Sequence, residues 1–179
     1  MKKAKSFVTP VGILCFPNVF EARAFDERSK EEYSAILVFP KGTDISLLVA
    51  KVKECAAAAG LKSGARNPIH DGNEKVADWG EIFRDAKFIR ISSQYQPSVV
   101  DASKHDILDK KQVYSGVYAR ASVHCYSYDS KGNSGVSIGL DAVQIVRDGE
   151  PLGGGAAAVA LFDEIPEDAA PAADPFGDL

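Results

Sequence analysis

The 179-residue sequence predicts a mainly β domain, built as a small antiparallel barrel with one main α-helix and followed by an acidic tail. At least five segments have the pattern of β-strands, because apolar residues alternate in them or run briefly between turn residues. Only one segment repeats its apolar residues at helical spacing, and turn-rich connections separate the rest. We therefore expect one barrel domain in residues 1–162 and a disordered tail in residues 163–179.

The first expected elements are two strands and the helix. GILCFPNVF (12–20) and YSAILVFP (33–40) are typical strand sequences, and the charged segment FDERSKEE between them predicts a connecting loop. The helix begins near Thr43 or Asp44, either of which can cap it, and ends at Gly60. Its apolar residues recur at helical spacing: Ile45, Leu48, Val49, Val52, Ala56 and Ala59.

A turn-rich stretch follows the helix, and a further strand follows that. Residues 62–80 are rich in Gly, Asn, Pro and Asp, which predicts a long exposed connection with turns at Asn67-Pro68 and Asp71-Gly72. In KFIRISS (87–93) the alternation returns. Ile89 and Ile91 then face one side of the strand, and Phe88, Arg90 and Ser92 face the other.

Two long strands, joined by the turn DSKGN, predict a hairpin with one small apolar face. In the first strand the apolar face consists of Val117, Ala119, Ala121, Val123 and Cys125, and the opposite face of Tyr114, Tyr118, Arg120, Ser122, His124, Tyr126 and Tyr128. In the second strand, the corresponding apolar face consists of Val136, Ile138, Leu140 and Ala142. Gly135 and Gly139 then leave flat room across the sheet. The oligonucleotide-binding (OB) fold is one barrel of this design.

Charge is distributed unevenly along the chain. Residues 1–162 carry all 21 Lys and Arg and 19 of the 25 Asp and Glu, a net charge of +2, whereas residues 163–179 carry the other six acids. A mildly basic body joined to an acidic tail suggests that the body binds an anionic partner. The alternative is that the tail is only a solvated terminus.

Several classes of protein are disfavoured by what the sequence lacks. No apolar run approaches the roughly 20 residues of a membrane span, and no signal peptide follows the first lysines, so we expect a cytoplasmic protein. Cys15, Cys55 and Cys125 are widely separated among apolar neighbours, which is typical of buried free thiols. No CxxC, HxxxH or HExxH spacing occurs, so we expect no metal site.

Enzymatic and nucleotide-binding motifs are also weak. GGGAAAVA (153–160) fits part of a dinucleotide fingerprint but lacks its strand, helix and acidic residue, and no GxxxxGK[ST] occurs. His70 and Asp71 are adjacent, yet no motif pairs them with a nucleophile. We therefore expect no catalytic residues and no cofactor.

The remaining candidate for a functional site is the face of the sheet that carries aromatic and cationic side chains. Base faces stack on aromatic side chains while cations contact the phosphates, so we expect single-stranded nucleic acid to bind there. The candidate residues are Phe88, Arg90, Tyr118, Arg120, Tyr126 and Tyr128, with Lys75 and Trp79 from the long connection. Two alternatives stay open: the tyrosines fill a second core under the helix or loops, and Trp79 packs back on the barrel. Duplex DNA fits less well, because no basic groove-reading helix is present.

Three stretches resemble a family of bacteriophage single-stranded DNA-binding proteins: NPIHDGNEK, SSQYQPSVVDA and the hairpin from VYSGVYARASVHCYSY to DGEPLGG. The chain is also similar in plan to phage replication proteins built on an OB fold with an acidic C-terminal tail. The resemblance implies sequence-tolerant, non-catalytic binding of single-stranded DNA (ssDNA) in phage replication, recombination or repair. It also implies that no metal or other cofactor is used. The alternating residue pattern by itself does not distinguish DNA from RNA as the ligand.

The resemblance extends to the tail, DEIPEDAAPAADPFGDL. Similar tails recruit replication or recombination proteins, which makes Asp174, Phe176 and Leu179 the candidate partner-binding residues. In the bacterial form Pro-Phe closes the chain, whereas here three residues follow Phe176. The runner-up function is a protein-interaction module that holds a partner peptide on the aromatic sheet, and an enzyme ranks third.

Overall fold

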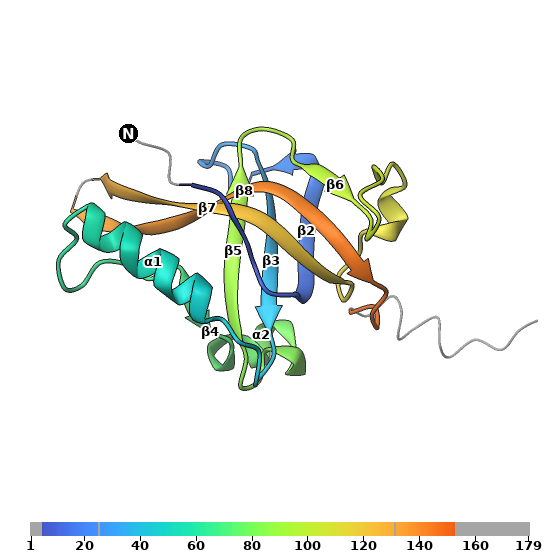
Figure 1. Cartoon of the computed structure of the whole chain (residues 1–179), viewed down its shortest axis with the longest axis horizontal. Helices are drawn as coiled ribbons and strands as arrows, with labels where there is room; N and C mark the ends of the chain where they lie inside the picture. Colours follow the sequence, from blue (N-terminus) through green and yellow to red (C-terminus); the bar gives the residue numbers. More distant parts are fainter. Residues whose placement is uncertain (1–4, 25, 131, 153–179) are drawn as a thin grey trace, which may run out of the picture.

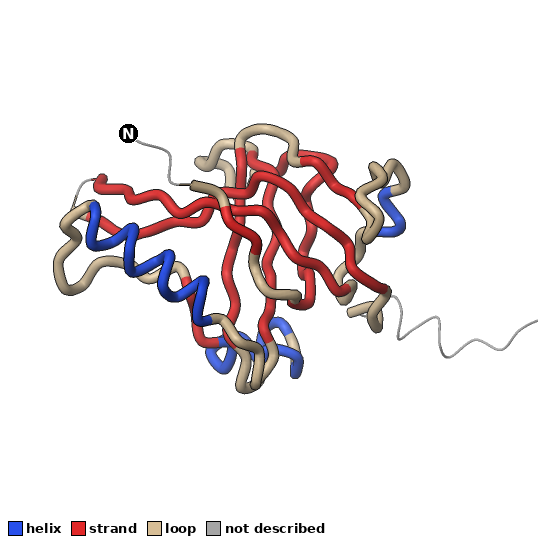
Figure 2. The backbone as a smooth tube through the Cα atoms, in the orientation of Figure 1, coloured by secondary structure: helices blue, strands red, loops and turns tan. Residues whose placement is uncertain are grey.

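A ring of five long strands forms the centre of the computed structural model, which describes residues 5–24, 26–130 and 132–152 (Figures 1 and 2). Hydrogen bonds join the strands in the order β2-β3-β5-β8-β7, and β7 pairs back with β2 to close the ring. All these pairs are antiparallel except β5–β8, which is parallel. The bounds are β2 Gly12–Arg23, β3 Glu32–Phe39, β5 Lys87–Ser93, β7 Tyr118–Ser130 and β8 Asn133–Arg147. The predicted mainly β, OB-like barrel is confirmed.

Three short strands flank the ring, and the sequence analysis missed all of them. β1 (Phe7–Val8) pairs with β7, β4 (Ile69–Asp71) pairs with β5, and β6 (Ser98–Val100) runs parallel to β8. Each has only two or three residues, which is too few for a period of two to be recognised.

The stretch that was expected to be a long exposed connection contains regular secondary structure. It contains β4 and then a series of short helical turns, η1 (Gly72–Lys75), α2 (Val76–Trp79) and, just beyond it, η2 (Glu81–Phe83). A last turn of this kind, η3 (Lys110–Gln112), precedes β7. The expectation of a plain connection was therefore wrong for residues 69–79.

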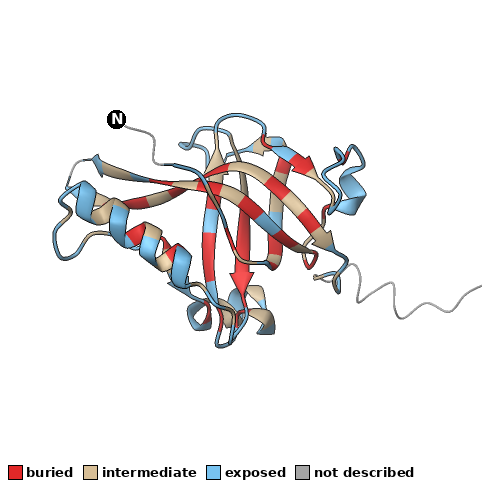
Figure 3. Cartoon of the chain, in the orientation of Figure 1, coloured by how far each residue is buried: buried red, intermediate tan, exposed pale blue. Residues whose placement is uncertain are grey.

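The main helix is α1 (Ser46–Ala58), as predicted. Just before it, the Asp44 carboxylate accepts hydrogen bonds from the Ser46 N–H and hydroxyl at 3.0 and 2.6 Å. After it, Gly60 adopts a φ of +64°, and the Leu61 N–H donates to the Ala56 carbonyl. Leu48 and Val52 are buried, and the opposite side of α1 is exposed (Figure 3). No helix among the described residues is both long and apolar enough to cross a membrane.

The barrel interior is filled by the predicted small apolar face of β7 together with Ile89 and Ile91 of β5. The inner face of β8 shifts at a β-bulge, because Leu140 pairs with Val123 while Ala142 pairs with Ser122. Asp141 is the extra residue, and beyond it Val143 and Ile145 face the core. The prediction that Ala142 lies on the inner face was wrong for this reason.

A second apolar cluster covers part of the outer face of the sheet. It contains Cys15, Ile36, Val38, Phe83, Ala86 and Phe88. Phe88 does point to the outer side of β5, as predicted, but only 5% of it is exposed because the helical turns of residues 72–83 pack over it. The predicted role of Phe88 as an open stacking surface therefore does not fit the structure.

Candidate functional site

Three adjoining cavities form a groove along the outer face of the barrel, which we call the outer groove. The first, of about 630 Å³, and the second, of about 220 Å³, share Arg90. The second and the third, of about 540 Å³, share Ser92. Arg90 and Ser92 lie two residues apart on the same face of β5, so this strand forms the floor that connects the three cavities.

Phe16 and Trp79 form the aromatic part of the first cavity. Their ring centroids are 5.4 Å apart in an edge-on arrangement, and 47% of Phe16 is exposed. Phe16 has a φ of +48°, which is rare for a bulky side chain, and it lies at an irregularity of β2 between Cys15 and Asn18. The sequence analysis missed Phe16 because GILCFPNVF has the pattern of a buried strand.

Trp79 and Lys75, two predicted site residues, contact each other beside the groove. The Lys75 Nζ lies 4.8 Å from the centroid of the Trp79 ring. Trp79 also packs against Phe83 and Phe88, with centroid distances of 5.4 and 5.7 Å. The alternative in which Trp79 packs back on the barrel is therefore the arrangement found, although part of its ring still lines the first cavity.

Arg66, Arg90 and Tyr128 surround the second cavity. Arg90 donates to the Glu32 carboxylate at 3.4 Å, and both side chains are partly exposed. A Cβ atom at Gly135 would lie 2.8 Å from the Arg66 Cβ and the Tyr128 hydroxyl. Gly135 was expected to leave open room on the sheet surface. The side chains of Arg66 and Tyr128 occupy that space instead.

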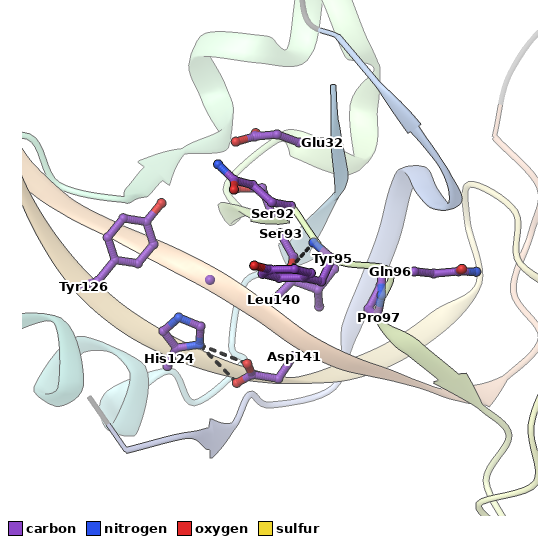
Figure 4. Close-up of a pocket in the computed structure, with 12 residues that line it drawn as sticks. Glu32, Ser92, Ser93, Tyr95, Gln96, Pro97, His124, Tyr126, Leu140 and Asp141 are labelled. Carbon is purple, nitrogen blue, oxygen red and sulfur yellow. Dashed lines mark hydrogen bonds and ion pairs between the residues drawn. The ribbon is translucent and has the colours of Figure 1, made fainter. Parts of the chain in front are cut away.

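His124 and Asp141 form a pair at the third cavity (Figure 4). The His124 Nδ1 lies 3.1 Å from both Asp141 oxygens, and Ser6 donates to Asp141 at 2.8 Å. A Cβ atom at Gly139 would come within 2.4 Å of the His124 ring, so this glycine makes room for the imidazole. The bulge in β8 and the missing side chain at Gly139 together fix the position of His124.

Two tyrosines also line the third cavity. Tyr126 is 39% exposed and its ring lies 6.1 Å from that of His124, while Tyr95 is 82% exposed on the loop after β5. Tyr126 was predicted from the alternation in β7. Tyr95 was missed because SSQYQPS has no periodic pattern and contains turn residues.

Tyr118 and Arg120 lie outside the three cavities. The Arg147 guanidinium stacks 4.2 Å from the Tyr118 ring centroid, and the Arg120 Nε donates to Gln144 at 2.7 Å. Arg120 lines a separate cavity with Lys104 and Val8. The aromatic face predicted as one surface is thus divided, because a strand that twists around a barrel turns its outer face in different directions along its length.

The outer groove offers stacking surfaces and cations. Its arginines are Arg23, Arg66 and Arg90, and no group of three or more candidate metal ligands occurs among the described residues. Burial raises the pKa of Cys15 to about 12 and that of Cys125 to about 11, so both thiols stay protonated at neutral pH. Cys15 and Cys125 are buried as expected, and Cys55 is partly buried.

Comparisons with known proteins agree with this chemistry. The model of a family described as the Enterobacter phage Enc34 ssDNA-binding protein matches residues 7–172. Protein p50 of Acyrthosiphon pisum secondary endosymbiont phage 1 is 30% identical over an alignment of 176 residues, and the match covers 85% of this chain and 89% of that protein.

Two solved structures share the fold. The single-stranded DNA-binding protein of bacteriophage Enc34, in complex with ssDNA, matches with a TM-score of 0.66 and 17% identity, over 83% of this chain and 89% of that one. The single-stranded DNA-binding protein of bacteriophage T7 matches with a TM-score of 0.62 and 14% identity, over 82% and 93%.

We expect His70, which lines the second cavity, to be neutral at pH 7. One face of its ring stacks on Phe88 at a centroid distance of 5.0 Å. This desolvation lowers the pKa of His70 below 6.5, Glu74 partly offsets the effect, and Lys75 adds to it. NMR titration of the folded protein should therefore give a lower midpoint for His70 than titration of the urea-unfolded chain.

The stability that His70 contributes should follow from the sign of this shift. Because the folded state disfavours the charged ring, the contribution is complete above pH 6.5 and is lost as the pH falls from there towards the lower folded-state value. A folded-state midpoint at or above that of the unfolded chain would contradict the partial desolvation of this ring by Phe88.

Proposed function

The chain belongs to the family of the Enterobacter phage Enc34 ssDNA-binding protein, and from this membership and the outer groove we propose that it coats ssDNA in a sequence-tolerant way. The proposed setting is phage DNA replication, recombination or repair in the host bacterial cytoplasm. The observation that carries the assignment is the continuous groove, which combines exposed rings with arginines. We propose that the protein acts without catalysis and without a cofactor.

Each part of the groove supplies a known component of ssDNA binding. Phe16, Tyr126 and Tyr128 offer aromatic rings on which bases can stack, at about 1–3 kcal/mol per base. Arg66 and Arg90 lie between these rings and can contact the phosphates. The exposed ion pair of Arg90 with Glu32 costs little to open, because surface pairs are typically worth about 0–1 kcal/mol.

The direct test of the function is fluorescence polarisation with labelled dT oligomers and matched duplex DNA at several salt concentrations. We expect the protein to prefer the single strand and to bind with an affinity that falls log-linearly with salt, because counterions are released. Equal or tighter binding of duplex would contradict the proposal. Binding of a peptide on the same aromatic surface would show little salt dependence, which separates the runner-up function from this one.

The exposed ring of Tyr126 is expected to contribute stacking energy. Tyr126→Ala should weaken ssDNA binding by about 1–3 kcal/mol, and Tyr126→Phe should bind nearly as well as the original protein because the ring is retained. Leu108→Ala, which truncates another exposed side chain outside the groove, is the matched control. A sharp fall in melting temperature with unchanged affinity would instead show that Tyr126 is a structural residue.

Arg90 and Arg120 form a matched pair, because both are exposed arginines on the outer face but only Arg90 lines the groove. Arg90→Ala should reduce the slope of log affinity against log salt by about 0.7, the value for one phosphate contact on single strands. Arg120→Ala should leave the slope unchanged if DNA follows only the groove. An equal loss for both variants would extend the DNA path to Tyr118 and Arg120, which the sequence analysis proposed as contacts.

The acidic tail, residues 163–179, lies outside the described residues, and its role stays a prediction. We propose that its six acids compete with ssDNA for the cationic groove. Removing the tail should tighten ssDNA binding, most strongly at low salt, whereas a tail with all six acids changed to their amides should behave like the truncation. Equal affinity of the full and truncated chains at low salt would contradict this competition.

The tail is also the proposed site for replication or recombination proteins. Asp174, Phe176 and Leu179 can supply charge and apolar anchors for a partner's pocket. In a pull-down with phage or host polymerase, the full chain should retain the enzyme, and the variant with Phe176→Ala and Leu179→Ala should lose it. Retention by that variant would place the contact elsewhere.

A further inference from the structure

The third cavity of the outer groove differs from the other two in charge. The first two share Arg90 and add Arg23 and Arg66, respectively. Among the described residues that line the third cavity are Glu32 and Asp141 but no lysine or arginine. A phosphate is therefore favoured along the arginines, and the carboxylate of Glu32 makes the third cavity better suited to an uncharged part of the strand.

The third cavity is large enough to take a nucleobase and is lined by aromatic and polar side chains. Figure 4 shows Tyr126 and Tyr95 on different sides of it, one from β7 and one from the loop after β5. Its volume of about 540 Å³ lies within the range of about 300–1,000 Å³ that is usual for small-molecule sites. Aromatic rings beside the base and polar groups at its edge are the usual way in which proteins hold an unstacked base.

Glu32 is the side chain of this cavity that can discriminate between bases. It is the first residue of β3, and its side chain is 33% exposed. Oε2 accepts one long hydrogen bond from Arg90 at 3.4 Å, and Oε1 has no hydrogen-bond partner among the described residues. An ionised carboxylate only accepts hydrogen bonds, whereas the amides of Gln94 and Gln96, which also line the cavity, can both donate and accept.

We propose that the third cavity takes one base of the bound strand and that Glu32 biases it towards guanine, an inference that rests on the proposed ssDNA binding. Guanine places two donors, N1–H and the N2 amino group, side by side on its Watson–Crick edge, which matches the two oxygens of a carboxylate. Thymine places a single donor, N3–H, between two carbonyl acceptors that a carboxylate repels. The glutamines and ring faces accept any base, so the bias is small and binding stays sequence-tolerant.

The test compares three labelled oligomers of equal length: a dT oligomer, an alternating d(TG) oligomer and an alternating oligomer in which deoxyinosine replaces every dG. Inosine keeps the purine ring and N1–H but lacks the N2 amino group, so stacking is nearly matched while one donor is removed. We expect the full chain to bind d(TG) about three- to five-fold more tightly than the inosine oligomer, below the range of a fully buried bidentate contact.

Glu32→Gln should separate discrimination from affinity. The preference for d(TG) over the inosine oligomer should fall to about one, because an amide cannot accept with two oxygens. Affinity for dT should be unchanged or higher, since a negative charge is removed beside Arg90. Glu54→Gln makes the same charge change on an exposed site of α1, next to Lys51 and outside the groove, and should keep the wild-type preference.

The outcomes distinguish this inference from the function on which it rests. Equal binding of the d(TG) and inosine oligomers by the wild-type protein, or a preference that survives Glu32→Gln, would overturn the guanine bias and leave ssDNA binding intact. Loss of the preference in both Glu32→Gln and Glu54→Gln would show a general charge effect and would also overturn it. Failure of the wild-type protein to bind any of the three oligomers would overturn both proposals.

Discussion

Closure of the five-strand ring is the constraint on which the rest of the structure depends. The β7–β8 hairpin closes it, because β7 pairs with β2 on one side and β8 pairs with β5 on the other. On β7, small residues such as Ala119 and Ala121 therefore face the interior, and larger side chains such as Arg120 and Tyr126 face outward. The bulge at Asp141 lets β8 follow the curvature and also anchors His124 at the groove. A single irregularity thus serves both the barrel and the site.

A period of two predicts the side of a sheet on which a residue lies, but not whether another segment covers it. Arg90, Tyr126 and Tyr128 were predicted in this way, and all three line the outer groove. Phe88 lies on the same outer side, yet the ordered turns of residues 72–83 bury it. Those turns contain too few residues for a periodic pattern, so the sequence did not predict that they cover Phe88.

The groove residues that sequence reasoning missed depend on irregular backbone. Phe16 is exposed because β2 is irregular between Cys15 and Asn18, and Tyr95 lies on a loop. Glu32 was assigned to a connecting loop, although it opens β3 and faces the third cavity. Conversely, Tyr118 and Arg120 share an alternation with Tyr126, but strand twist turns them away from the groove. The sequence pattern predicts on which side of its strand a residue lies. Closure of the ring then determines which of these side chains lie close together.

If ssDNA binds as proposed, the distribution of charge along the groove allows general binding and a weak base preference to coexist. Phosphates are identical in every sequence, so Arg23, Arg66 and Arg90 attract all strands equally. An acidic residue beside them lowers that general affinity, and the proposed contact of Glu32 with a base offsets this cost. Because Glu32 pairs with Arg90 in the free protein, the same carboxylate shields the cation until a strand arrives. Once a phosphate occupies Arg90, the carboxylate is left facing the third cavity, where the donors of a base are the partners that can satisfy it.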